Sequence, residues 1–153
     1  WGTTVLPGQA ITMDNVMDQN CITYPETYRR EKSGAEIKNI LEDVCDNLFN
    51  PDPDEQQGGD MVRVGGLENV CDPTATIGNR IQDMVLDDGT KIEADKNYVV
   101  AGWATVGSQS PGEPIWDTVA KYLRDVKTVK IEKLNTPKLL NVEGNPGLQD
   151  YPA

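Results

Sequence analysis

Residues 33–50 read SGAEIKNILEDVCDNLFN, and this stretch decides the class of fold. Ser33, followed three residues later by Glu36, is the capping-box pattern that opens an α-helix. Apolar residues then recur at the spacing of one helix face, namely Ile37, Leu41, Val44 and Leu48. Because Pro51 cannot continue a helix, the pattern predicts a helix over residues 34–49.

The segments after this helix are predicted to be strands. Residues 61–71 read as a strand interrupted at Gly65-Gly66, where a bulge is expected. Asp88-Gly89, between two β-forming segments, is a strong hairpin signal. Residues 98–105 are largely apolar, which favours a central position in a sheet. Val129 and Ile131 are expected to add a last short strand.

Two further helices flank this region. Thr12 suits the N-cap of a short helix in which Val16 and Met17 face inward. Pro114 suits the first position of a helix that carries Ile115 and its apolar neighbours. About three helices interspersed with five or six strands predict an α+β or mixed α/β fold, in which the helices pack on a mixed sheet with hairpins.

The length of the chain, 153 residues, is close to that of one ordinary domain. We expect residues 1–153 to form a single domain, with an extended lead-in over 1–11 and an extended tail over 134–153. Apolar runs are shorter than the ~20 residues that span a bilayer. The chain begins at Trp1 rather than at a Met, which suggests a piece of a longer protein.

Charge and composition exclude several classes of function. A net charge of -11 disfavours nucleic-acid binding. The chain has no His, the residue most used as a general base and as a ligand of transition metals. The acidic stretch 52–60 lacks the spacing of an EF-hand loop and reads as a solvated loop. We therefore assign no catalytic residue and no metal ligand, and expect the chain alone to be inactive.

The three cysteines, Cys21, Cys45 and Cys71, form neither a CxxC pair nor a zinc spacing. Cys45 lies on the inward side of the predicted 34–49 helix, and Cys71 alternates in phase with Leu67 in its strand. This pair is the best candidate for a disulfide in an oxidising compartment. Two buried free thiols are the alternative.

Two loops are suited to present polar groups to a ligand. Arg63 lies among glycines, where a guanidinium can reach an anion with little steric hindrance. The loop over residues 107–113 leads into a helix N-terminus, which favours a negative group. The alternative for Arg63 is a surface ion pair with a neighbouring carboxylate. The alternative for the 107–113 loop is a simple connection between two elements.

Several segments together resemble the C-terminal domain of the 5′-nucleotidase superfamily. These segments are residues 33–37, 64–67, 71–73, 80–81, 88–90 and 98–101. Within the superfamily, longer runs resemble the SoxB family of thiosulfohydrolases, namely residues 1–4, 6–12, 22–25, 27–30, 56–66 and 110–116. The second resemblance covers nearly the whole chain.

The resemblance to SoxB implies a two-domain periplasmic hydrolase of thiosulfate oxidation. In such enzymes an N-terminal metallophosphatase-like domain holds two manganese ions, and the C-terminal domain closes over the cleft. Such enzymes hydrolyse the terminal sulfonate from a cysteine S-thiosulfonate on the carrier protein SoxYZ and release sulfate. The lack of His agrees with metal ligands that lie in the other domain.

The sequence departs from nucleotidases, which clamp the nucleobase between two aromatic rings of this domain. The position near Val64 is aliphatic and the 107–113 loop has no aromatic residue, so nucleobase stacking is not expected. We expect a narrow channel for the carrier's arm instead, lined by Thr23, Tyr24, Arg63, Ser108, Gln109, Ser110 and Glu113. The alternatives are the same domain of a periplasmic 5′-nucleotidase or cyclic phosphodiesterase, and a secreted binding module without a catalytic partner.

Overall fold

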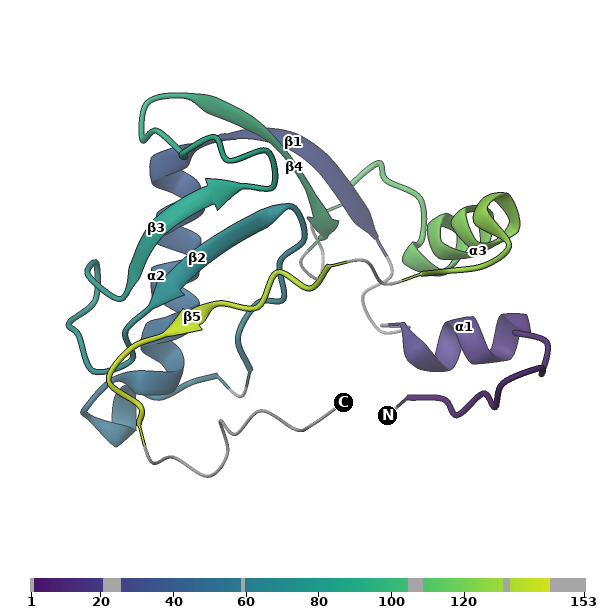
Figure 1. The fold of residues 1–153 in the computed structure, drawn as a ribbon, viewed down its shortest axis with the longest axis horizontal. Coiled ribbons are helices and arrows are strands. Elements are labelled where there is room, and N and C mark those ends of the chain that lie inside the picture. The colour runs from purple at the N-terminus through teal and green to yellow at the C-terminus, as the bar shows by residue number, and fades with distance from the viewer. Residues whose placement is uncertain (1, 21–25, 59, 105–108, 131–132, 144–153) are drawn as a thin grey trace. The chain divides into compact units, whose positions relative to one another are not determined.

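The computed structural model describes residues 2–20, 26–58, 60–104, 109–130 and 133–143. These residues form three α-helices, one short 3-10 helix (Pro53–Glu55) and five strands (Figure 1), which confirms the predicted α+β class. β1 (Thr27–Ser33) and β4 (Asn97–Trp103) make a two-stranded sheet. The other three strands make a second sheet in the order β3-β2-β5.

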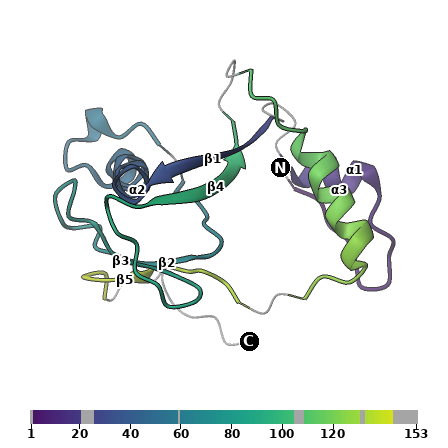
Figure 2. The ribbon, with the colours of Figure 1, turned by 90° about the horizontal axis from the view of Figure 1, so that it is seen from above.

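The chain divides into two compact units. The first contains residues 1–31 and 99–132, and the second contains residues 32–98 and 133–153. In the first unit, α1 (Met13–Gln19) and α3 (Ile115–Val126) pack side by side (Figures 1 and 2). The second unit contains α2 (Gly34–Phe49) and the three-stranded sheet.

The helix α2 has the bounds that its capping box predicts. The Ser33 hydroxyl accepts a hydrogen bond from the Glu36 backbone N–H, and the Glu36 carboxylate accepts one from the Ser33 N–H at 2.7 Å. Gly34 is required at the first turn because a Cβ there would collide with the backbone carbonyl of Glu93. Capping and close backbone contact thus fix where the helix begins.

The strand β2 (Leu67–Cys71) is the centre of the three-stranded sheet. It pairs antiparallel with β3 (Ile81–Leu86) and parallel with β5 (Lys138–Leu139). α2 lies over one face of this sheet (Figure 2). Side chains from α2, β2 and β3 form the core of the unit, namely Leu41, Cys45, Leu67, Cys71 and Ile81.

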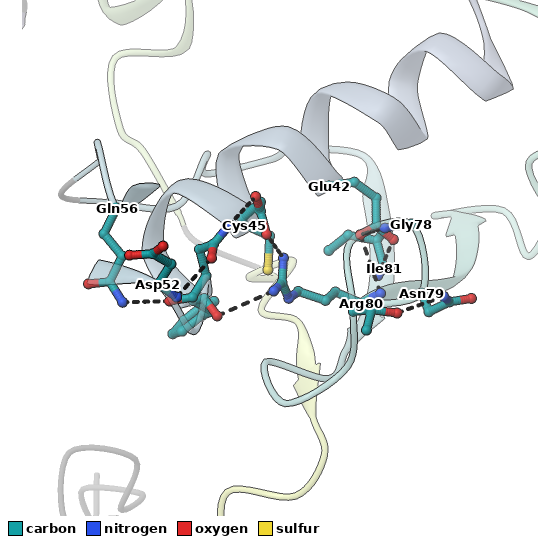
Figure 3. A network of polar contacts seen from close by, with 12 residues as sticks. Glu42, Cys45, Asp52, Gln56, Gly78, Asn79, Arg80 and Ile81 are labelled. Carbon is teal, nitrogen blue, oxygen red and sulfur yellow. Dashed lines mark hydrogen bonds and ion pairs between the residues drawn. The ribbon is translucent and has the colours of Figure 1, made fainter. Parts of the chain in front are cut away.

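A buried polar network ties α2 to the turn before β3 (Figure 3). The Glu42 carboxylate accepts hydrogen bonds from the backbone N–H groups of Gly78 at 2.8 Å, Arg80 at 3.3 Å and Ile81 at 2.7 Å. The Arg80 side chain is 2% exposed and donates to the Asp46 carboxylate. Burial of a charged group is costly unless it is paired, so these contacts are what allow Glu42 and Arg80 to be buried.

Polar contacts fasten the segment before β5 to the sheet. The Lys133 ammonium lies 2.6 Å from the Glu68 carboxylate and 2.8 Å from that of Asp87. The Asn135 amide donates to Asp87 and accepts from the backbone N–H of Gly66 at 3.0 Å. The segment expected to be an extended tail therefore supplies a strand to the sheet. Of the two residues predicted to form a last strand, Val129 belongs to no strand, and Ile131 lies outside the described residues.

Three other details differ from the predictions. The apolar composition of β4 predicts a central strand, but β4 pairs with β1 alone within the described chain, and Val99 and Trp103 are exposed. Composition does not reveal that one face of a strand is uncovered. Met17, predicted to face inward, is 36% exposed, because α1 buries Val16 instead. The Asp88-Gly89 turn forms, yet its second arm makes a single bridge, from Val85 to Lys91.

Candidate functional site

The predicted polar loop lies against the beginning of β1, within the first unit. The Ser110 hydroxyl donates to the Thr27 carbonyl at 2.5 Å, and the Thr27 hydroxyl donates to the Glu113 carbonyl at 2.7 Å. Glu26 and Pro114 form an antiparallel bridge beside these bonds. The described part of the loop is therefore fixed to β1 by two hydrogen bonds, one to a carbonyl of β1 and one to a carbonyl of the loop.

Gly112 and Pro114 set the path from the loop into α3. A Cβ at Gly112 would collide with the Thr27 carbonyl, so only glycine permits this approach without a shift. Pro114, predicted to be the first residue of the helix, is instead the N-cap of α3, which begins at Ile115, and it makes no side-chain capping bond. The loop thus reaches the helix through a tightly fitted backbone.

A cavity of about 480 Å³ lies between this loop and β1. It is lined by Tyr28, Arg29, Arg30, Ala104, Gln109, Ser110, Pro111 and Gly112. The Arg30 guanidinium lies over the Tyr28 ring, 4.2 Å from the ring centroid, a cation–π contact. Guanidinium groups bind carboxylates, sulfonates and phosphates through paired N–H donors. In a chain with 25 acidic and 14 basic residues, two adjacent arginines on one cavity make it a candidate site for an anion.

The structure brings only part of the predicted site together. Gln109 and Ser110 line the cavity. The Glu113 carboxylate instead pairs with the Lys121 ammonium of α3. Three further predicted residues, Thr23, Tyr24 and Ser108, lie outside the described residues.

Arg63 lies in the second unit, in the segment before β2. Its side chain is 84% exposed and its guanidinium lies 2.8 Å from the Asp60 carboxylate. An exposed pair of this kind is screened by water and adds little to stability. Arg63 therefore does not support the core, and its role at a substrate stays a prediction.

Sequence reasoning does not select Tyr28, Arg29 and Arg30 as site residues. The one sequence feature that could have pointed to them is a pair of adjacent arginines, Arg29 and Arg30, in an acidic chain. These residues reach the loop because β1 begins beside it, through the bond between Ser110 and Thr27, which are 83 residues apart. A contact of that range is not visible in local sequence patterns.

No group of three or more His, Cys, Asp or Glu side chains is placed to hold a metal ion in the described ranges. Cys45 and Cys71 are free and buried, and burial raises the pKa of the Cys45 thiol to about 12. A thiol with so high a pKa is a poor nucleophile near neutral pH. The described helices also include none with the length and apolar composition needed to cross a bilayer.

Comparison with known proteins places this fold. Residues 2–117 match the family described as 5′-nucleotidase, C-terminal domain. The chain belongs to this family. Among solved structures, sulfate thiohydrolase SoxB from Thermus thermophilus, in complex with glycerol, is similar with a TM-score of 0.78 and 38% identity, over 92% of this chain and 27% of that chain.

A second solved structure shares the fold at lower identity. A 5′-nucleotidase precursor from Thermus thermophilus is similar with a TM-score of 0.64 and 17% identity, over 86% of this chain and 28% of that chain. The chain thus spans little more than a quarter of the length of either protein. No curated protein sequence matches it significantly. The resemblance to the 5′-nucleotidase superfamily, with SoxB among its similar structures, is confirmed.

Proposed function

We propose that the chain is the substrate-covering C-terminal domain of a SoxB-like thiosulfohydrolase. The observation that carries this proposal is 38% identity to SoxB over 92% of the chain, against 17% over 86% for the nucleotidase precursor. The reaction is hydrolysis of the sulfonate from a cysteine S-thiosulfonate on the carrier SoxYZ, with release of sulfate. The proposed setting is thiosulfate oxidation in the periplasm.

The cavity of the first unit suits an anionic group on a thin arm. Arg29 and Arg30 supply cationic donors, and Gln109 and Ser110 supply neutral polar groups. Tyr28 is the one aromatic residue among the described cavity residues, and Arg30 already lies over its ring. The arrangement favours hydrogen bonding to a sulfonate over stacking on a nucleobase.

The remaining predicted residues extend this proposal toward the carrier. We assign Thr23, Tyr24, Ser108 and Glu113 to the path of the carrier's arm, together with Arg63 as a cation for the sulfonate or the carrier's backbone. The described residues hold no metal-binding cluster, so they do not fit the two manganese ions, which we assign to an N-terminal metallophosphatase domain. This chain binds and orients the substrate and excludes water from it.

The test uses the complete polypeptide that contains the chain, loaded with manganese. Sulfate release from a carrier-bound cysteine S-thiosulfonate is measured beside phosphate release from AMP. We expect turnover of the thiosulfonate and little turnover of AMP, and no turnover above a buffer blank for residues 1–153 alone. Preference for AMP would favour the nucleotidase alternative, and no turnover of either substrate would contradict the proposed hydrolysis.

The role of the arginines is tested by single substitutions in the same polypeptide. Arg30→Ala and Arg63→Ala should each lower kcat/KM by ~10–100-fold, or ~1.5–3 kcal/mol, the range for a hydrogen bond to a charged group. Arg124→Ala is the matched control, because Arg124 is an exposed residue of α3 that does not line the cavity. An unchanged kcat/KM in either variant removes that arginine from the site.

A further inference from the structure

Two buried thiols meet in the core of the second unit. The Sγ atoms of Cys45, in α2, and Cys71, at the end of β2, lie 3.6 Å apart. The two residues are 0% and 3% exposed. A separation of 3.6 Å is van der Waals contact between sulfurs, and a disulfide requires an S–S length of about 2.05 Å.

The surrounding structure holds the two thiols close to each other. Glu42, three residues before Cys45 in α2, accepts hydrogen bonds from the backbone at the start of β3 and so fixes α2 against that strand. Since β3 pairs with β2, the same contacts keep Cys45 near Cys71. The other buried members of this core cluster are Leu41, Leu67 and Ile81.

We propose that Cys45 and Cys71 form a disulfide bond when the chain folds in an oxidising environment, and this inference does not depend on the proposed function. The two thiols lose two protons and two electrons. A low-molecular-weight disulfide such as oxidised glutathione accepts the electrons, and its S–S bond is cleaved to give two thiols. The reaction passes through a mixed disulfide on one cysteine, which the thiolate of the other then displaces.

Burial of the two thiols determines at which stage of folding the disulfide can form. Desolvation by burial raises the pKa of both thiols, that of Cys45 to about 12, so the folded core contains almost no thiolate to attack an oxidant. Exchange therefore takes place while the core is still open to solvent. Once closed, the core shields the bond from reductants for the same reason.

Peptide mapping tests the pairing directly. The chain is refolded in a buffer of oxidised and reduced glutathione, its free thiols are alkylated, and it is digested with trypsin. The three cysteines fall in separate tryptic peptides, residues 1–29, 39–63 and 64–80. We expect a linked pair of peptides 39–63 and 64–80, with Cys21 alkylated. Alkylation of both Cys45 and Cys71, or linkage of either one to Cys21, would overturn the proposal.

Thermal unfolding provides a second measurement. The bond closes a loop between residues 26 positions apart, so the oxidised chain should have a Tm roughly 5–15 °C above that of the reduced chain. Cys21→Ser should keep this difference and Cys45→Ala should abolish it. Equal Tm values for the oxidised and reduced wild-type chain contradict the proposal even if a substituted chain fails to fold.

Discussion

Arginine side chains from the two units of the molecule differ in whether they are buried or exposed. In the second unit, Arg80 is 2% exposed and donates to Asp46 and to the Phe49 carbonyl. In the first unit, Arg29 and Arg30 are exposed at the wall of a cavity. The buried guanidinium of Arg80 directs two donors to internal acceptors and leaves its Nε–H without one among the described residues, whereas an exposed guanidinium at a cavity keeps its donors for a ligand. The number of arginines says nothing of function until their burial is known.

The largest expected effect is loss of the buried carboxylate of the second unit. Glu42→Ala removes the acceptor of three backbone N–H groups and leaves those of the buried Arg80 and Ile81 unpaired beside the core. We expect the free energy of unfolding to fall by about 3–5 kcal/mol, the range for breaking a buried charged contact. Urea unfolding measures this change.

Asp43→Ala is the matched control for that substitution. Asp43 is the next residue of α2 and is exposed, so its loss should change the free energy of unfolding by no more than ~0.5 kcal/mol. Equal effects of the two substitutions would show that the buried network does not stabilise the second unit.

A smaller effect is expected from crowding the loop of the first unit. Gly112→Ala places a Cβ against the Thr27 carbonyl and should cost about 1–3 kcal/mol through displacement of the loop. Gly65→Ala is the control, because a Cβ there meets no atom within 4 Å. Thermal unfolding of both variants checks the prediction. A Gly112→Ala chain as stable as wild type would show that the loop can move to accommodate the Cβ at no cost in stability.

The smallest effect concerns acid stability. The hydrogen bond from Arg80, and then that from Asn50, hold the pKa of Asp46 below its usual value of 3.8. A lowered pKa in the folded state gives stability that is present above about pH 4 and is lost as the pH falls through the folded pKa. Asp46→Asn should therefore lose less stability than wild type between about pH 5 and about pH 3. Urea unfolding at the two pH values measures the difference, and an equal loss in both chains would contradict it.

Local signals predict the helices of this chain well and its long-range pairings poorly. The capping box at Ser33 and Glu36 marks the start of α2, and Pro51 marks the residue before which the helix has to end. The pairing of β2 with β5 joins Cys71 to Leu139, and no local pattern encodes it. Such contacts depend on tertiary packing, which outweighs local propensity.

The candidate site is predictable to the same extent. The loop that holds Gln109 and Ser110 is recognisable from its turn-forming residues and from the helix after it. Its neighbours Arg29 and Arg30 are not, because they join the loop only through the position of β1. Turn-forming residues identify a loop in the sequence, but no local pattern identifies the residues of another strand that line a cavity with it.

The short strand β5 has a consequence for how the chain behaves when it is cut. It covers the outer edge of β2, where the Leu140 N–H donates to the Cys71 carbonyl at 3.0 Å. An uncovered strand edge offers unpaired N–H and C=O groups to strands of other molecules and promotes aggregation. Proteolysis or truncation before Lys133 would expose that edge, and we expect the shortened chain to self-associate through it.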